Sequence, residues 1–271
     1  MEILIADLIL GGTALILGLM LSYASKVFAV KVDEKEAALR ESLPGANCGA
    51  CGYAGCDGYA EALSKGEAEP NLCAPGGSET AKALGDILGV EVSMIPKKAV
   101  VKCKGCLDNA QFRYDYSGLI SCASAMTIAG GPKDCSFGCL GLGDCMRACE
   151  FNAITIKNGL PQIDLDICGG CGGCASACPK GIISIMEFPF KPTVLCKSKD
   201  KGAISRKVCK ASCIGCGICA KNCEAGAITV TDFLAEIDPH KCTGCGACAD
   251  ACPTKAIKKV FFPDIPEENE Q

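Results

Sequence analysis

The sequence predicts an α+β fold in which one amino-terminal helix precedes several small units, each too short to build a large apolar core. Three observations support this prediction. Residues 8–25 carry no charged side chain, the 271 residues include 25 cysteines and 32 glycines, and only 5% of the residues are aromatic. Chains of this composition depend on bound cofactors or cross-links more than on one hydrophobic interior.

The charge-free stretch at residues 8–25 predicts a membrane-spanning helix. Its eighteen residues would extend about 27 Å as an α-helix, close to the hydrocarbon thickness of a bilayer, and eight of them are Leu or Ile. Because acidic residues precede the stretch and Lys26 and Lys31 follow it, the positive-inside rule places the amino terminus outside and the body in the cytoplasm. A cleaved signal peptide is the alternative, but its basic first segment is missing. We therefore expect residues 1–30 to be a single-pass anchor in the inner cell membrane, in contact with lipid.

Residues 31–95 predict a small four-cysteine domain that starts with an amphipathic helix at 33–43. The motif LPGANCGACGYAGC follows, and a fourth cysteine after a sixteen-residue gap completes the set Cys48, Cys51, Cys56 and Cys73. Glycines between the cysteines allow backbone amides to face a cluster sulfur. We interpret this set as the ligands of one [4Fe-4S] cluster, with a tetrahedral zinc site as the alternative.

Sixteen cysteines between positions 135 and 252 form two pairs of four-cysteine runs. Three runs read CxxCxxCxxxC, a spacing in which three cysteines bind one [4Fe-4S] cluster and the fourth binds the neighbouring cluster. The first run is stretched to CxxxCxxxxxCxxxC, and each run is followed by a similar tail such as EAGAITV, which predicts a helical turn and a short strand. The sequence thus predicts two tandem bacterial-type 2[4Fe-4S] ferredoxin-like modules, at 135–190 and 211–262.

Crossing between paired runs defines the four expected ligand sets. They are Cys135, Cys139, Cys145 and Cys178; Cys168, Cys171, Cys174 and Cys149; Cys213, Cys216, Cys219 and Cys252; and Cys242, Cys245, Cys248 and Cys223. Zinc sites and disulfides also use closely spaced cysteines, but neither needs a crossing partner. Because each module is small and poor in large apolar side chains, we expect metal ligation to supply much of its folding free energy and the apo modules to be largely unfolded.

Five cysteines lie outside these sets: Cys103, Cys106 and Cys122 in a connecting segment at 96–134, and Cys196 and Cys209 in a basic linker at 191–210. Two interpretations stay open. The first three residues bind a sixth cluster, with either Cys196 or Cys209 giving the fourth thiolate, or the five pack as buried free thiols. An acidic tail occupies 263–271.

Absent motifs exclude several functions. The 27 basic and 31 acidic residues give a net charge of −4, and neither a basic face nor stacking aromatics indicate nucleic-acid binding. No GxGxxG follows a predicted strand and no GxxxxGK[ST] loop is present, so we expect neither NAD nor flavin on this chain and no nucleotide hydrolysis. His240 is the only histidine, and we assign no catalytic residue. The sequence indicates an electron carrier that performs no bond chemistry itself.

Taken together, the apolar start, the LPGANCGACGYAGC stretch, the CLGLGDC sequence at 139–145 and the tandem modules resemble the B subunit of the Rnf complex. The resemblance covers nearly the entire chain. It implies a translocase subunit that accepts electrons from soluble reduced ferredoxin, within a membrane complex that reduces NAD and exports Na⁺ or H⁺. It also implies other Rnf membrane and NADH-binding subunits as partners.

Ferredoxins are commonly acidic, so the basic linker is a candidate docking patch through Lys197, Lys199, Lys201, Arg206 and Lys207. A solvated linker is the alternative interpretation of the same charges. Two other functions remain open at the level of sequence. One is a membrane-tethered polyferredoxin that serves another oxidoreductase or reduces a redox-sensing regulator, and the other is a protein whose clusters are purely structural.

Overall fold

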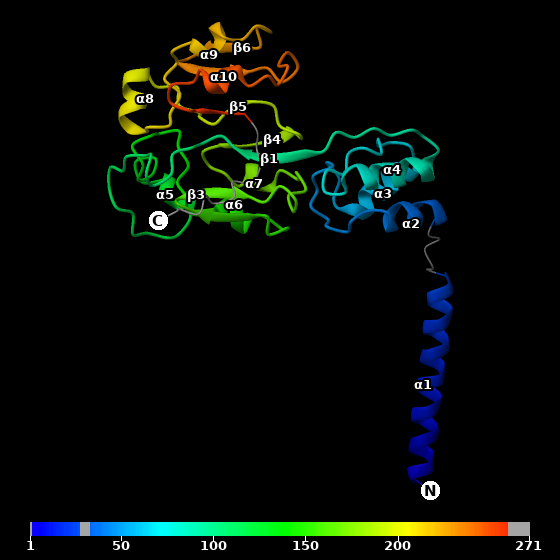
Figure 1. Ribbon diagram of the computed structural model, residues 1–271. Helices are drawn as coiled ribbons and strands as arrows, with labels where there is room; N and C mark the ends of the chain where they lie inside the picture. The colour runs from blue at the N-terminus through cyan, green and yellow to red at the C-terminus, as the bar shows by residue number, and fades with distance from the viewer. Residues whose placement is uncertain (1, 28–32, 260–271) are drawn as a thin grey trace, which may run out of the picture.

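The computed structural model describes residues 2–27 and 33–259, which form one long amino-terminal helix and a body of three small units (Figure 1). Helix α1 (Glu2–Val27) extends away from the body. The body starts with a helical unit and continues with two similar α+β modules (Figure 1). Buried apolar side chains in the described residues fall into five separate clusters, so no single large core holds the body together.

Helix α1 corrects the prediction of a transmembrane segment at residues 8–25. Across 2–27 and 33–259, no helix combines the length and the apolar character that a bilayer crossing demands. The predicted membrane-spanning helix and the single-pass topology derived from it are therefore wrong.

The helical unit consists of α2 (Glu34–Glu41), α3 (Cys56–Ser64) and α4 (Gly77–Leu88), which enclose a core around the buried ring of Tyr59. The Tyr59 hydroxyl donates a hydrogen bond to the Glu69 carbonyl (2.6 Å) and accepts one from the Leu72 amide (3.2 Å). These bonds fix the loop before Cys73 against the helix that begins at Cys56. Two cysteines far apart in sequence are thereby held in one core.

The first module contains three short helices and four strands. They are β1 (Lys97–Val101), α5 (Cys122–Met126), α6 (Asp144–Arg147), β2 (Ile154–Lys157), β3 (Leu160–Ile163), α7 (Gly173–Ser176) and β4 (Ile183–Glu187). Strands β2 and β3 form a hairpin, and β1 pairs antiparallel with β4, with Ala99 opposite Ile185. The segment expected to be a connection before residue 135 thus supplies an edge of the first module.

The second module repeats this plan. It comprises β5 (Thr193–Val194), α8 (Gly202–Val208), α9 (Ile218–Lys221), β6 (Ile228–Thr231), β7 (Leu234–Ile237), α10 (Ala247–Asp250) and β8 (Ile257–Lys258). A β6–β7 hairpin matches β2–β3, and the β5–β8 pair matches β1–β4. The expected basic linker therefore contains one strand and one helix of its own.

A glycine in one cluster-binding loop packs against β1 and yields a testable difference between the modules. Gly170 and Gly244 each stand two residues after the first cysteine of a run, with φ of +69° and +82°. A methyl group at Gly170 would overlap the backbone carbonyl of Lys97, whereas nothing lies within 4 Å of the same position at Gly244.

Gly170→Ala should therefore destabilise the chain far more than Gly244→Ala. Both variants carry the strain of a left-handed alanine, about 1–2 kcal/mol, but only the first must also separate its loop from β1. We expect Gly170→Ala to lose iron and to unfold at lower denaturant concentration, as measured by visible absorbance and circular dichroism. Equal stability of the two variants would contradict the packing described.

Candidate iron-sulfur centres

The four cysteines of the helical unit line one cavity, together with Tyr59 and Pro75. Cys48 and Cys51 come from the loop before α3, Cys56 is the first residue of α3, and Cys73 comes from the loop before α4. The Asn47 side-chain oxygen accepts a hydrogen bond from the Cys56 amide (2.8 Å), which fixes the loop that carries Cys48 and Cys51 against the start of α3. Burial raises the pKa of the Cys73 thiol, while a hydrogen bond from the Gly76 amide acts in the opposite direction. The predicted set of Cys48, Cys51, Cys56 and Cys73 is thus brought together around one cavity.

The second module gathers a predicted crossed set around another cavity. Its lining includes Cys213, Cys216 and Cys219 from one run and Cys252 from the other. Burial raises the pKa of Cys219 to about 11. Burial acts in the same direction on Cys252, but hydrogen bonds from the Thr254 hydroxyl and nearby backbone amides outweigh it and lower the pKa of that thiol. The surroundings of Cys252 therefore favour its thiolate form, which is the form that binds iron.

Two more sets are also gathered. Burial raises the pKa of Cys248, and the charges of Cys242 and Cys245 raise it further, so these three thiols lie close together. Cys223 packs against the buried cluster that contains Cys248. In the first module, burial raises the pKa of Cys174 to about 12, and the charges of Cys168, Cys171 and Cys149 raise it further. The three regular runs therefore keep their cysteines together, and the crossing partners Cys149 and Cys223 lie beside them.

The stretched first run is divided in the structure. Cys145 lies close to Cys178, a member of its expected set, and also to Cys122. Cys135 instead lines a cavity with Cys103, Cys196 and Cys209. The structure therefore brings most of the five leftover cysteines to the module that the stretched run belongs to, which the spacing alone did not indicate.

The chemistry of these thiols fits an iron-sulfur cofactor. All 25 cysteines are free thiols, and soft thiolates are the ligands that iron-sulfur clusters require. Backbone amides approach several sulfurs at 3.4 Å, as Ala153 does for Cys149 and Ala227 for Cys223, and such bonds stabilise thiolate charge. In the described ranges, no three metal-binding side chains are grouped to hold one metal ion. The four cysteines of a [4Fe-4S] cluster surround a multi-iron core, so a shared cavity is the arrangement that this cofactor needs.

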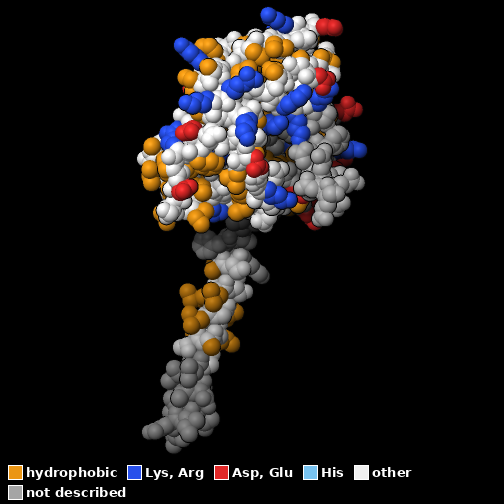
Figure 2. Space-filling model, turned by 60° about the vertical axis from the view of Figure 1, so that its left-hand side comes forward, with side chains coloured by type: hydrophobic (Ala, Val, Ile, Leu, Met, Phe, Trp, Pro, Cys, Tyr) orange, Lys and Arg blue, Asp and Glu red, His pale blue; other side chains and the backbone are white. Residues whose placement is uncertain are grey.

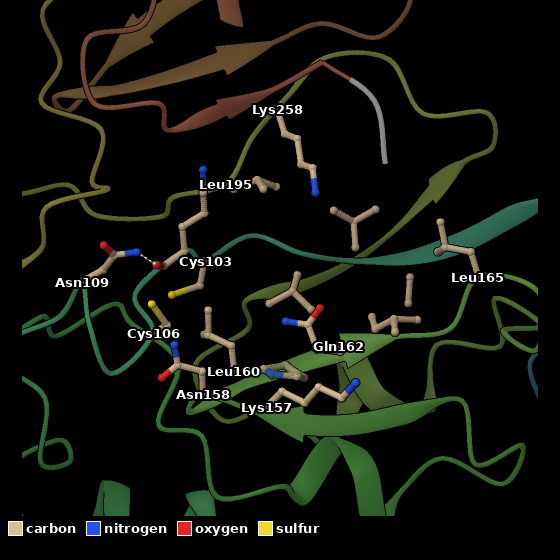
Figure 3. A pocket seen from close by; sticks show the side chains of 16 residues that line it. Cys103, Cys106, Asn109, Lys157, Asn158, Leu160, Gln162, Leu165, Leu195 and Lys258 are labelled. Atoms are coloured by element: carbon tan, nitrogen blue, oxygen red, sulfur yellow. Dashed lines mark hydrogen bonds between the residues drawn. The ribbon is translucent and has the colours of Figure 1, made fainter. Parts of the chain in front are cut away.

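A larger cavity of about 470 Å³ lies between β1, the β2–β3 hairpin and the β5–β8 pair. Figure 3 shows the sulfur atoms of Cys103 and Cys106 at one end of this cavity. Gln162 and Leu160 also line it. The Asn109 side chain donates a hydrogen bond to the Lys104 carbonyl (3.0 Å) at the same end. With two cysteines in its lining, this cavity lacks the four thiolates of a cluster site.

The basic side chains expected to form a docking patch are not equivalent. Lys199, Lys201, Arg206 and Lys207 are exposed, and Lys199 pairs with Asp232 (3.2 Å). Lys197 is only half-exposed, donates a hydrogen bond to the Gly181 carbonyl and lines the cavity that contains Cys135. Figure 2, in which the α8 side of Figure 1 comes forward, shows Lys and Arg side chains spread over this face of the body.

Comparisons with known families agree with these centres. Residues 43–75 match an Fe-S cluster family, and residues 134–182 and 212–256 each match the 4Fe-4S dicluster domain family. The first match spans the cavity of the helical unit, and the other two span the modules. The chain therefore carries [4Fe-4S] clusters.

Relatives with high similarity extend over most of the chain. It is 44% identical over 252 residues to the B subunit of the ion-translocating oxidoreductase complex of Methanosarcina acetivorans, covering 92% of this chain and 96% of that protein. The chain is 43% identical over 202 residues to the B subunit of the proton-translocating ferredoxin:NAD⁺ oxidoreductase complex of Clostridium ljungdahlii, covering 73% of this chain and 71% of that protein. The chain is also 43% identical over 207 residues to the B subunit of the Na⁺-translocating ferredoxin:NAD⁺ oxidoreductase complex of Acetobacterium woodii, covering 76% of this chain and 62% of that protein.

The chain thus spans less than two thirds of the Acetobacterium woodii protein and nearly all of the Methanosarcina acetivorans protein. The resemblance noted in the sequence is confirmed by identities above 40% across three relatives and by the dicluster matches in both modules. The chain belongs to the family of B subunits of ion-translocating ferredoxin:NAD⁺ oxidoreductase complexes, the Rnf family.

Proposed function

We propose that this chain accepts electrons from reduced ferredoxin and relays them to the other subunits of an Rnf-type complex, which couples ferredoxin oxidation and NAD⁺ reduction to Na⁺ or H⁺ export. Each bound [4Fe-4S] cluster supplies a redox centre whose potential depends on its protein surroundings. The chain works at a membrane as part of that complex. Its body faces the cytoplasm, a compartment in which its 25 free thiols stay reduced.

One observation carries this proposal: the cysteine sets follow one another in a row. Burial raises the pKa of Cys171, and the charge of Cys48 from the helical unit raises it further. A methyl group at Gly169 would come within 3.0 Å of Pro75, which lines the cavity of the helical unit. The helical unit therefore abuts the cysteine run that starts at residue 168.

The row continues through both modules. Within the first, Cys145 lies close enough to Cys174 to raise its pKa. Between the modules, burial raises the pKa of Cys196 to about 11, and Cys213 and Cys103, one from each side, raise it further. Within the second module, Cys219 and Cys248 share a buried cluster. The cysteines thus offer a continuous path from the second module to the helical unit.

The second module is the better place for ferredoxin to deliver electrons. Cys216 and Cys245, one from each of its ligand sets, are exposed, whereas every cysteine of the other predicted sets is buried or half-buried. The exposed basic side chains at the start and end of α8 belong to the same module. A positively charged surface beside an accessible ligand set would steer an acidic donor to it.

Replacing two of these basic residues tests the docking surface. The double variant Lys201→Glu with Lys207→Glu should slow cluster reduction by ferredoxin roughly tenfold at low salt, and the difference should shrink as salt rises. Stopped-flow absorbance under anaerobic conditions would measure the rate. Lys35→Glu with Lys82→Glu is a matched control, because it makes the same change in net charge on exposed side chains of the helical unit.

The same experiment tests the proposed function as a whole. Clusters that relay electrons must lose visible absorbance when reduced ferredoxin is added, whereas purely structural clusters would keep it. If the parent chain is not reduced by ferredoxin at any salt concentration, the proposed function fails. If the parent is reduced and both double variants behave alike, only the docking surface is wrong.

A further inference from the structure

A cavity between the two modules has the residues of an additional cluster site. Its lining contains four cysteines, Cys103, Cys135, Cys196 and Cys209, from four different segments of the chain. The two cavities that match predicted sets, in the helical unit and in the second module, are likewise lined by four cysteines each. Because a [4Fe-4S] cluster takes four thiolates, this third cavity meets the same requirement.

Hydrogen bonds to these sulfurs follow the pattern of the predicted ligands. The Cys103 sulfur accepts from the amides of Gly105 and Cys139, both at 3.4 Å. The Cys196 sulfur accepts from the Ser198 amide at 3.5 Å. Corresponding bonds to predicted cluster ligands elsewhere in the chain are also 3.4 Å long. Backbone amides directed at sulfur stabilise the thiolate form, which is the form that binds iron.

A buried lysine points independently to an anion in this cavity. Lys133 is 2% exposed and lines the cavity. Its ammonium group donates a hydrogen bond to the Gly105 carbonyl (2.5 Å) and lies 5.6 Å from the centre of the Phe112 ring. Among the described residues, Lys133 has no ion pair with a carboxylate. A buried ammonium group needs a compensating negative charge, and a cluster with four thiolates carries net negative charge.

The stretched first run explains how Cys135 is available for this cavity. Cys139 and Cys145 are six residues apart, as Cys213 and Cys219 are, and Leu142 takes the position that a cysteine occupies in the regular runs. The set that uses Cys139 and Cys145 therefore needs a replacement for one ligand. Cys135 precedes the stretch from Cys139 to Cys149 that aligns with a regular run, so that set does not require Cys135 as a ligand.

Cys122 is held close to Cys145. The Asp144 carboxylate, next to Cys145, accepts hydrogen bonds from the Ser121 hydroxyl (3.1 Å) and the Ala123 amide (2.9 Å). These two bonds flank Cys122 on both sides. Burial raises the pKa of Cys145 to about 11, and the charges of Cys122 and Cys178 raise it further, so the three thiols lie close together.

We infer that the chain binds a sixth [4Fe-4S] cluster through Cys103, Cys135, Cys196 and Cys209, with Lys133 as its buried counter-charge, and that Cys122 joins Cys139, Cys145 and Cys178 in the first module. This assignment exchanges Cys135 for Cys122 in the set that the crossing rule gives. The inference depends on the proposed function only for the role of the sixth cluster, which is to place a redox centre between the modules. Cluster binding itself is measured without ferredoxin.

Electrostatics sets this site apart from the others. Lys102, Lys104, Lys133 and Lys197 all line the cavity, and no acidic residue does. Positive charge favours the more negative, reduced form of a cluster. The sixth cluster should therefore have a higher reduction potential than its neighbours.

Alanine variants of single cysteines in the full chain test the site. Cys209→Ala should lose about four of about 24 iron atoms and one cluster signal in electron paramagnetic resonance of the reduced protein. Cys106→Ala is the matched control, because Cys106 does not line this cavity, and it should keep the parent's iron and sulfide. Full iron content in Cys209→Ala would overturn the inference.

A double variant tests the exchange of ligands. If Cys122 and Cys135 serve different clusters, Cys122→Ala with Cys135→Ala loses about eight iron atoms, roughly twice the loss of either single variant. If the double variant loses no more iron than one single variant, both residues serve one cluster and the assignment is wrong.

Lys133→Met covers the case in which Cys209→Ala fails to fold, because it leaves every thiol in place. It should retain all the iron and shift the reduction potential of one cluster to a more negative value in a redox titration followed by paramagnetic resonance. Unchanged potentials for all clusters would contradict the cavity assignment, whatever the behaviour of the cysteine variants.

Discussion

Removal of iron should unfold both ferredoxin-like modules. Their helices apart from α8 have four or five residues and their strands two to five. The two main buried clusters of the modules are composed in large part of cysteines, among them Cys139, Cys145, Cys219 and Cys248. Without metal, these positions hold small thiols that add little apolar burial.

The size of the effect follows from metal-coupled folding. Structural metal binding supplies about 10–16 kcal/mol in small zinc domains, which is as large as the total stability of about 5–15 kcal/mol that a typical domain has. Far-ultraviolet circular dichroism should therefore show loss of the module structure after anaerobic iron chelation. Restoring iron and sulfide under reducing conditions should return the signal. A chelated chain that keeps native dispersion in its nuclear magnetic resonance spectrum would contradict this prediction.

Cys252→Ser should have the second large effect. Cys252 lines the same cavity as Cys213, Cys216 and Cys219, although its own run lies about 30 residues further along the chain. Hydrogen bonds from Thr254 and backbone amides lower the pKa of Cys252 despite its burial, so this thiol is prepared to bind iron. Its replacement should remove the cluster of the Cys213 set and interrupt the row of centres inside the second module.

Iron spectroscopy and electron transfer would measure the two consequences separately. We expect loss of about four iron atoms per chain, and reduced ferredoxin should no longer reduce the centres of the first module at the parent's rate. Thr254→Val is a milder comparison, because it removes one hydrogen bond and keeps the ligand. If Cys252→Ser instead removes the cluster of the Cys242 set, the crossed assignment is wrong.

Ligand spacing explains why much of the site could be predicted. A CxxCxxCxxxC run brings its first three sulfurs together locally, and its fourth cysteine can only reach a partner run. The cavity that contains Cys252 together with Cys213, Cys216 and Cys219 agrees with that interpretation. The repeated tails also predicted a short strand after each fourth cysteine, and β2, β4, β6 and β8 occur in the expected places.

Long-range contacts explain what the sequence did not reveal. The pairing of β1 with β4 joins residues more than 80 positions apart, and no local sequence pattern at 97–101 predicts it. The position of Cys122 depends on hydrogen bonds to Asp144, and Lys133 is identified only by its burial. The one signal in the sequence for the exchange of ligands was Leu142, which stands where the regular runs have a cysteine.

The amino-terminal helix shows the limit of a purely compositional argument. The absence of charge at 8–25 predicted a helix, and α1 covers that stretch. The further step to a membrane span was wrong, because a bilayer crossing also demands a sufficient length of apolar helix, and the described helices do not provide it. Membership of the family rests on the cysteine-rich body and its relatives and is unaffected by this correction.

Iron and acid-labile sulfide in the full chain, purified without oxygen, give the most direct test of a cysteine-bound row of redox centres. Six clusters predict a brown protein with about 24 iron atoms and about 24 sulfides per chain, whereas the four crossed sets and the Cys48 set alone predict about 20 of each. A colourless protein without inorganic sulfide, or one with zinc in place of iron, would contradict the account.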